Sequence, residues 1–338
     1  MEDRYSRQYL FNKIGKQGQN KIANKQVLIV GVGALGSSSA EALVRAGIGK
    51  LTVIDRDYVE WSNLQRQQLY TEQDARNQLP KATAAKQRLE QINSDVHIHE
   101  VVADATIETL ENLLNDVDLI IDATDNFDIR FVLNDLTQKH RIPWIFGSCV
   151  GSYGATFTII PNKTPCLHCL LKQLPMGGAT CDTVGVISPT VQMVASYQVT
   201  EAMKILVEDF ESLRETYLSF DLWNNQYYNV NMEKMRGEGC PSCGIQPSYP
   251  YLSYENQTKT EVLCGRDTVQ IRPAKSIPYD FEQLEQQLKR HGKINKNPYL
   301  LSCQLQDYRL VVFKDGRSFV HGTNSIQEAK KVYYRYLA

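Results

Sequence analysis

One short glycine-rich run constrains the fold of this chain more than any other feature. Gly31-Val-Gly-Ala-Leu-Gly36 follows an apolar, β-branched run at 27–30 and precedes a helical pattern that opens on small residues. Glycines between a strand and a helix permit a tight turn, and the free N–H groups of the helix attract a phosphate. Asp55 ends the next apolar run, 19 residues after Gly36, where a carboxylate can accept hydrogen bonds from ribose hydroxyls. The pattern predicts a nucleotide site at the first crossover, with a tight turn that binds no ligand as the alternative.

The rest of the first two thirds of the chain alternates short apolar runs with amphipathic ones. Strands are expected at 27–30, 51–54, 117–121 and 144–146, and helices at 37–46, 81–92, 127–139 and 190–207. Strands that alternate with helices indicate a parallel sheet covered on both faces. The predicted fold is therefore α/β, with a Rossmann-like, doubly wound, mostly parallel sheet.

Length and turn-forming residues indicate a second, smaller domain. A chain of 338 residues suggests about two domains, and a Pro-, Ser- and Tyr-bearing segment near 240–254 is typical of a linker. We expect one domain over 1–244, a linker over 245–258 and a small α+β domain over 259–338. The last is predicted to have a βαββα pattern, and it either recruits a partner or serves as a packing extension.

Charge and hydropathy exclude several classes of partner. The 37 Lys and Arg against 38 Asp and Glu give a net charge of −1, so no global positive field attracts nucleic acid or an anionic membrane. No run approaches the ~20 apolar residues of a membrane helix. The N-terminus opens with acidic residues and has no apolar run behind it, which argues against a signal peptide. We expect a cytoplasmic protein whose eight cysteines serve metal binding or catalysis more often than disulfides.

Polar side chains follow the predicted strands at the same edge of the sheet. The run at 62–68 supplies Asn63 and Arg66, Lys81 opens the next helix, and Asp125 follows the strand that ends near 121. Cleavage of a triphosphate requires charge neutralisation on several oxygens, whereas hydride transfer does not. Asp125 is placed to hold Mg²⁺ on the phosphates. An NAD-dependent oxidoreductase is the competing hypothesis, since it shares the glycine turn and Asp55.

The cysteines fall into two groups. Two CxxC pairs, Cys166/Cys169 and Cys240/Cys243, have the spacing that places two thiolates on one turn, and two such turns can close a four-sulfur zinc site. Redox-active pairs or unrelated cysteines are the alternative. Cys181 lies in a Gly-rich loop, where an exposed thiol could attack an activated acyl group or have no covalent role.

Together these motifs resemble the ThiF/MoeB/HesA family, bacterial relatives of the ubiquitin-activating enzymes. The resemblance covers residues 4 to about 244 and rests on the Arg4-Tyr-Ser-Arg7-Gln8 opening, the glycine run, the runs at 62–67 and 122–126, Cys181 and both CxxC pairs. Family members adenylate the C-terminal Gly-Gly carboxylate of a small β-grasp sulfur-carrier protein. The resemblance implies an ATP-dependent adenylyltransferase that releases pyrophosphate, with a carrier of the molybdopterin pathway expected slightly ahead of a thiazole-pathway carrier. A nucleotide-binding adaptor without catalysis is the non-enzyme alternative.

The resemblance also implies roles for individual residues. Arg7 would reach the triphosphate bound by the partner subunit, which implies a homodimer, and Cys181 matches a cysteine that links to the carrier in some members. The implied zinc ligands are Cys166, Cys169, Cys240 and Cys243. The implied catalytic residues are Arg7, Arg66, Lys81, Asp125 (also the Mg²⁺ ligand) and Cys181. The implied nucleotide-binding residues are Gly31, Gly33, Ala34, Gly36, Asp55, Asp57, Ser62, Asn63, Arg66, Lys81, Asp125 and Asn126.

Overall fold

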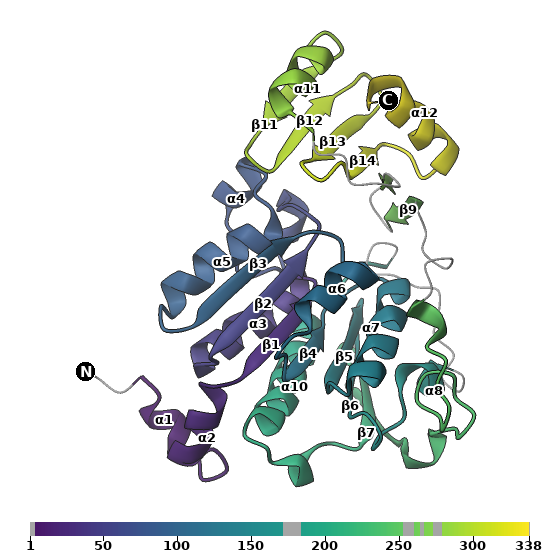
Figure 1. The fold of residues 1–338 in the computed structure, drawn as a ribbon. Helices are drawn as coiled ribbons and strands as arrows, with labels where there is room; N and C mark the ends of the chain where they lie inside the picture. The colour runs from purple at the N-terminus through teal and green to yellow at the C-terminus, as the bar shows by residue number, and fades with distance from the viewer. Residues whose placement is uncertain (1–3, 172–183, 253–259, 264–266, 273–278, 338) are drawn as a thin grey trace. The chain divides into compact units, whose positions relative to one another are not determined.

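The computed structural model describes residues 4–171, 184–252, 260–263, 267–272 and 279–337. The chain forms two compact units, one built mainly from residues up to Ser253 and the other from Tyr254 onward. Each unit has its own sheet with helices packed against it (Figure 1). None of the described helices is long and apolar enough to cross a membrane.

The sheet of the first unit has eight strands in the order β3-β2-β1-β4-β5-β6-β7-β8. Neighbouring strands run parallel from β3 to β5 and antiparallel from β5 to β8. Because β1 pairs with β2 on one side and β4 on the other, the carboxyl ends of these three strands meet at a switch point, where ligands collect in open α/β sheets. The strands are β1 Gln26–Val30, β2 Lys50–Asp55, β3 His97–Val102, β4 Leu119–Asp122, β5 Trp144–Val150, β6 Tyr153–Ile159, β7 Thr216–Asp221 and β8 Gln226–Asn231.

Helices cover both faces of this sheet, and β1 shows why. Its Val27 and Ile29 belong to one core cluster with side chains of α3, α5 and α10, while Leu28 and Val30 belong to another with α6 and α7. Successive side chains of a strand point to opposite faces, so a strand buried on both sides must be apolar throughout. The helices of this unit are α1 Ser6–Tyr9, α2 Gly15–Ile22, α3 Ala34–Ala46, α4 Glu72–Arg76, α5 Lys81–Ile92, α6 Ile107–Leu113, α7 Phe127–His140, α8 Leu167–Leu171 and α10 Ser188–Leu206.

The second unit is built on an antiparallel sheet of six strands in the order β11-β12-β13-β14-β10-β9. Its core joins Leu284 and Leu288 of α11 and Val332 of α12 to sheet residues such as Leu301 and Val320. The strands are β9 Thr260–Leu263, β10 Thr268–Ile271, β11 Lys293–Lys296, β12 Leu300–Gln304, β13 Arg309–Phe313 and β14 Ser318–His321, and the helices are α11 Phe281–Leu288 and α12 Ile326–Leu337. The predicted βαββα elements are present, with three further strands around them.

Part of the segment expected to be a linker is packed against the first unit. Residues Pro250–Leu252 form a 3-10 turn that contacts α7. The ring of Tyr251 stacks on Phe131 of α7 with the centroids 4.4 Å apart. This stretch is anchored because the aromatic ring of Tyr251 packs against the ring of Phe131.

Candidate functional site: a nucleotide-binding edge and a four-cysteine cluster

The glycine run forms the turn between β1 and α3. Gly31 has a φ of +88°, and a Cβ there would lie 2.7 Å from the carbonyl oxygen of Ala123. A Cβ on Gly36 would lie 2.0 Å from the carbonyl oxygen of Gly31, so neither position accepts a side chain without a backbone shift. The N-cap of α3, Gly33, provides no side-chain cap. The first turn of the helix, which starts at Ala34, therefore presents N–H groups and a positive dipole end to an anion.

Asp55, at the end of β2, is braced against this turn. Its Oδ2 accepts a hydrogen bond from the N–H of Val32 at 2.7 Å, and its Oδ1 accepts one from the N–H of Asp57 at 2.7 Å. Burial raises the pKa of Asp55, and the positive charge of Lys81 opposes that rise. The carboxylate is thus fixed beside the glycine turn, where ribose hydroxyls could donate to its remaining lone pairs.

Lys81 and Asp57 form an ion pair at the same edge. The Lys81 Nζ lies 2.9 Å from the Asp57 Oδ2, and its side chain is only 4% exposed. The backbone reinforces the pair, because the N–H of Lys81 donates to the carbonyl of Asp57 at 2.9 Å. The hydroxyl of Tyr70 donates to the carbonyl oxygen of Val32 at 2.5 Å and lies 3.2 Å from the carbonyl oxygen of Lys81, so it links the start of α5 to the glycine turn.

Two buried amides near the turn have polar atoms without a partner in the part of the chain that the structure describes. Asn63, which ends a 3-10 turn at Trp61–Asn63, accepts from the N–H of Glu60 through its Oδ1, but its Nδ2 has no hydrogen-bond partner. Gln67 is 3% exposed, its Oε1 also lacks a partner, and its Nε2 lies 3.7 Å from the place a Gly33 Cβ would take. Buried polar atoms are rarely left unpaired, so these amides fit a site completed by a polar ligand.

Arg66 lies on the same segment in a more open position. Its guanidinium donates from Nη1 to the carbonyl oxygen of Ser62 at 2.8 Å, and Ser62 itself is exposed. The head group of Arg66 is therefore held near the rim of the edge by a backbone contact. An arginine held in this way retains further donors for phosphate oxygens.

The loop after β4 is held by a buried ion pair that sequence analysis did not single out. The Arg130 Nε lies 2.9 Å from the Asp122 Oδ2, with side-chain exposures of 4% and 0%. The Arg130 Nη2 also donates to the carbonyl oxygens of Thr124 and Gly147, at 2.5 and 2.9 Å. Burial raises the pKa of Asp122, while Arg130 and the hydrogen bonds from Thr124 oppose the rise. This network fixes the backbone that leads to Asp125.

Asp125 and Asn126 occupy different environments at the end of that loop. Asp125 is exposed, so its carboxylate faces solvent. The Oδ1 of Asn126 caps α7 by accepting from the N–H groups of Asp128 and Ile129, at 2.7 and 3.4 Å. Asp125 therefore offers a hard oxygen ligand, while the Asn126 carbonyl already has a structural task.

Of two further predicted residues, one lies away from this cluster of strand ends and the other cannot be placed. Arg7 is on α1, which packs against α2, and its side chain is exposed. Cys181 lies outside the described residues. The remaining predicted nucleotide-binding residues all follow the carboxyl ends of β1, β2 and β4 or begin α5.

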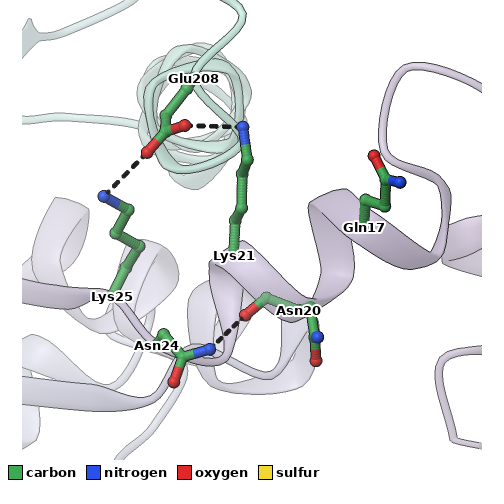
Figure 2. A pocket seen from close by; sticks show the side chains of 6 residues that line it. All are labelled: Gln17, Asn20, Lys21, Asn24, Lys25 and Glu208. Carbon is green, nitrogen blue, oxygen red and sulfur yellow. Dashed lines mark hydrogen bonds and ion pairs between the residues drawn. The ribbon is translucent and has the colours of Figure 1, made fainter.

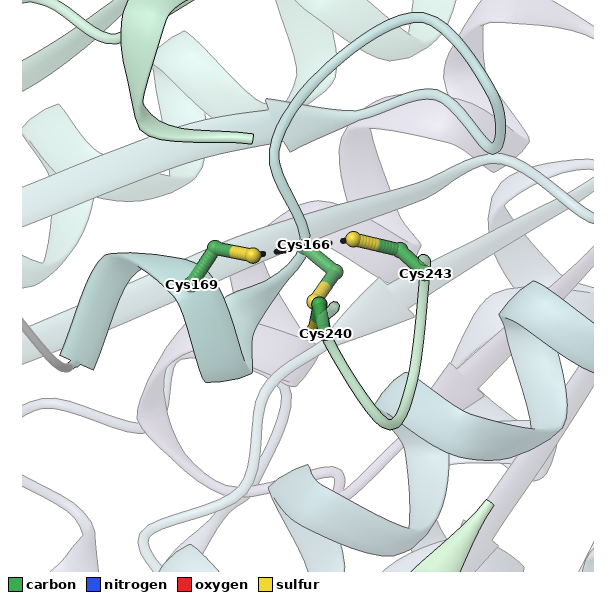
Figure 3. A group of neighbouring side chains, drawn as sticks. All are labelled: Cys166, Cys169, Cys240 and Cys243. Atoms are coloured by element: carbon green, nitrogen blue, oxygen red, sulfur yellow. Dashed lines mark hydrogen bonds between the residues drawn. The ribbon is translucent and has the colours of Figure 1, made fainter. Parts of the chain in front are cut away.

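The two CxxC pairs come together as one buried cluster, as the spacing predicted (Figure 3). Their four sulfur atoms lie within 4.8 Å of one another, and the Sγ atoms of Cys166 and Cys240 and of Cys169 and Cys243 are both 3.6 Å apart. Four sulfurs at the ~2.3 Å bond length of a tetrahedral zinc site would be about 3.8 Å apart. The donor set and its spacing therefore fit zinc.

The electrostatics of the cluster also favour a cation. Hydrogen bonds with Cys169 and Cys243 raise the pKa of Cys166, and hydrogen bonds with Cys166 and Cys243 lower the pKa of Cys169. Neighbouring thiols thus share protons, because several thiolates at this spacing repel one another. A divalent cation removes that repulsion and allows all four sulfurs to ionise.

A separate surface pocket of about 510 Å³ lies between α2 and the end of α10 (Figure 2). Its two lysines, Lys21 and Lys25, both pair with Glu208, at 2.6 and 3.4 Å. Lys25 also pairs with Asp118 at 3.1 Å, so two carboxylates balance the two lysines, and none of the strand-end residues lines the pocket. It is therefore not a candidate for the nucleotide site.

Comparisons with known proteins agree with this architecture. The ThiF family model matches residues 5–242. The sulfur carrier protein ThiS adenylyltransferase of Bacillus subtilis (strain 168) is 52% identical over 338 residues, which cover 100% of both chains. The molybdopterin-synthase adenylyltransferase of Salmonella typhimurium is 33% identical over 243 residues, covering 71% of this chain and 96% of that protein. Among solved structures, MccB of E. coli shares the fold, with a TM-score of 0.64 at 22% identity over 73% of each chain. The chain belongs to the ThiF family.

Proposed function

We propose that this chain adenylates the C-terminal carboxylate of a small β-grasp sulfur-carrier protein with ATP and releases pyrophosphate. The observation that carries the proposal is the group of charged and amide side chains around the glycine turn. Asp55, Asp57, Lys81, Asn63 and Gln67 are gathered there, two of them with unpaired buried polar atoms. The relatives named above are adenylyltransferases, and one of them matches this chain over its whole length.

The chemistry that this edge would serve is attack of a carboxylate oxygen on the α-phosphorus of ATP. One O–P bond forms, the bond from the α-phosphorus to the bridging oxygen breaks, and the electron pair leaves with pyrophosphate. Such a step needs alignment and charge neutralisation more than proton transfer. The cations Arg66 and Lys81 would provide the neutralisation, and the glycine turn and Asp55 would align the nucleotide.

Asp125 is proposed to hold Mg²⁺ on the phosphates. Its exposed carboxylate provides the oxygen ligand that Mg²⁺ prefers, and Mg²⁺ commonly takes only one or two carboxylates besides phosphate oxygens. A bound Mg²⁺ would neutralise charge on the phosphate oxygens. Arg130 and Asp122 would keep the backbone before Asp125 in place for that purpose.

Full-length similarity favours a ThiS-like carrier over a molybdopterin-pathway carrier. The match to the Bacillus subtilis ThiS adenylyltransferase extends through residues 260–337, the small second unit. The molybdopterin-synthase adenylyltransferase covers 71% of this chain. The order of preference expected from the sequence is therefore reversed, and the molybdopterin-pathway carrier becomes the second candidate.

Three further features belong to the proposal. The four-cysteine cluster holds a structural zinc ion, because it is buried and offers four sulfurs at tetrahedral spacing. The protein acts as a homodimer, in which Arg7 reaches the phosphates bound by the partner subunit. Cys181 acts as the covalent nucleophile. It works in the cytoplasm, where a reducing environment keeps cysteines available to a metal.

The test is carrier-dependent exchange of labelled pyrophosphate into ATP. The purified protein is mixed with a ThiS-like or a molybdopterin-pathway carrier, each intact or lacking its terminal Gly-Gly. Exchange with the intact ThiS-like carrier, and with neither shortened carrier, is the expected result. Exchange only with the other intact carrier would reverse the pathway assignment. ATP binding without exchange for either carrier would support the non-catalytic adaptor instead.

A further inference from the structure

The four-cysteine site is fastened to α7 by two adjacent side chains, Asn134 and Asp135. Both are fully buried, although they lie between the apolar core residues Leu133 and Leu136. A buried polar group without a partner costs about 1–3 kcal/mol. The contacts of these two adjacent polar side chains should therefore explain why both are buried.

Asn134 holds the first cysteine pair. Its Oδ1 accepts a hydrogen bond from the N–H of Leu167 at 2.8 Å. Leu167 directly follows Cys166 and begins α8, the short helix that carries Cys169. This one contact therefore fixes the turn on which both cysteines of the first pair are displayed.

Asp135 holds the segment that carries the second pair. Its Oδ2 accepts a hydrogen bond from the N–H of Tyr251 at 2.9 Å. Burial raises the pKa of Asp135, and the nearby hydroxyl of Ser242, which is fully buried between Cys240 and Cys243 and has no hydrogen-bond partner among the described residues, opposes that rise. The Tyr251 ring stacks on Phe131, one turn earlier on α7. The chain after the second pair is thus anchored on the same helix as the first.

The contacts form one hydrogen-bonded network that converges on the carboxylate of Asp135. Leu167 donates to Asn134, the Nδ2 of Asn134 donates to the Oδ1 of Asp135 at 3.3 Å, and Tyr251 donates to the other oxygen of Asp135. Asp135 therefore accepts at both of its oxygens. A carboxylate can do this, whereas an asparagine amide accepts on one side only.

We propose that Asn134 and Asp135 are positioning residues for the metal: they hold the two cysteine pairs at binding distance and slow the release of zinc. This inference rests on the zinc site of the proposed function. Partners that orient metal ligands typically contribute 10–100-fold to metal affinity. The pair would therefore control how firmly the site keeps its ion, without touching the ion.

The test measures zinc release from the full-length, zinc-loaded protein to a chromophoric chelator. Asp135→Asn keeps the shape but supplies a donor where an acceptor is needed, and Asn134→Leu removes both hydrogen bonds. We expect zinc release about 10–100-fold faster from either variant. The control is Thr137→Val, because the buried Thr137 hydroxyl donates to the backbone carbonyl of Asn134, at 2.9 Å, and not to the Asn134 side chain that holds Leu167. Its release rate should stay within about twofold of wild type.

Each remaining outcome has a distinct meaning. Wild-type release rates in folded Asp135→Asn and Asn134→Leu would overturn the inference but leave the zinc site standing. Wild-type protein that holds no zinc, and gives no tetrahedral thiolate spectrum with Co²⁺, would remove the zinc site itself. If neither α7 variant folds, Ser242→Ala decides, because it deletes one hydroxyl beside Asp135. Unchanged release from Ser242→Ala would then count against the inference, and faster release would support it.

Discussion

The ammonium of Lys81 lies 2.9 Å from the carboxylate of Asp57, inside the protein and at the mouth of the glycine turn. The pair holds the ammonium of Lys81 at the proposed nucleotide-binding edge before any nucleotide binds. It also influences Asp55, since the charge of Lys81 opposes the burial that raises the pKa of that carboxyl. A cation fixed in advance needs little reorganisation when charge develops on a phosphate, which is the condition for strong electrostatic stabilisation.

Replacement of Lys81 by methionine should therefore abolish most of the activity. Lys81→Met keeps the volume but removes the charge, and we expect carrier-dependent pyrophosphate exchange to fall about 100-fold or more. Lys86→Met is the matched control on α5, because Lys86 pairs with Glu100 at 2.6 Å and is 31% exposed. Exchange within a few-fold of wild type in a folded Lys81→Met protein would contradict the assigned role.

A methyl group at Gly36 should disrupt the turn. Its Cβ would lie 2.0 Å from the backbone oxygen of Gly31, which cannot move aside as a flexible side chain could. We expect Gly36→Ala to lower the free energy of unfolding by about 2 kcal/mol or more, measured by urea denaturation, and to weaken ATP binding. Gly239→Ala is the control, because an added Cβ there would meet no atom within 4 Å among the described residues beyond its two chain neighbours. Equal stabilities of the two variants would show that the turn tolerates the clash.

Loss of Arg130 should make stability depend on pH. Burial already raises the pKa of Asp122, and Arg130→Met removes the charge that opposes the rise. A carboxyl with a raised pKa in the folded state binds its proton more tightly there, so the variant loses stability as pH rises through that pKa. Because both side chains are buried, the loss should reach about 3–5 kcal/mol when Asp122 is ionised.

Urea denaturation at about pH 5 and about pH 8 checks the Arg130 prediction. The difference in unfolding free energy between wild type and Arg130→Met should be larger at the higher pH. Arg45→Met, which breaks an exposed pair with Glu41, should show no such difference. An equal loss for Arg130→Met at both pH values would mean that the charge of Asp122 does not decide its stability.

The β7–β8 turn offers a titration test. The Ser152 hydroxyl donates to Asp221 at 2.7 Å and, as the main cause, lowers the pKa of Asp221 to about 2. At pH values above 3.8, the ordinary pKa of this carboxyl, the Asp221 carboxylate stabilises the turn. This contribution is lost as the pH falls towards about 2. Ser152→Ala should raise the pKa of Asp221, measured by NMR. Asp209, held by Ser212, serves as the internal reference and should not change. An unchanged pKa of Asp221 would remove Ser152 as the cause.

The most apolar runs could be predicted from the sequence, whereas β3, β6, β7, β8 and β11 were not predicted. The run at 27–30 is buried on both faces, and it corresponds to β1. β8 is exposed along its whole length and β11 alternates exposed with half-buried residues, so neither carries an apolar signal. Both are edge strands, held by backbone hydrogen bonds to one neighbour that sequence periodicity does not report.

The candidate site divides in the same way. Glycines, strand-end carboxylates and CxxC spacing follow local rules, and the structure brings both cysteine pairs together. Gln67, Arg130 and Asn134 were missed because a polar residue in a helical or turn pattern is usually solvated. Their importance comes from partners distant in the sequence, such as Gly147 for Arg130 and Leu167 for Asn134.

The four-cysteine cluster differs from a zinc finger because it is assembled against helix α7 of a larger domain. The cluster lies against α7, a helix that packs on the eight-stranded sheet. This helix begins directly after its cap Asn126, and its Arg130 holds the loop after β4. At 1.5 Å per residue, Asn126 and Asp135 are only about 13 Å apart along the helix. The four-cysteine segment is consequently not an independent module. Transplanted alone, it would lose the helix surface on which it is assembled, and its removal from this chain would leave one side of α7 exposed.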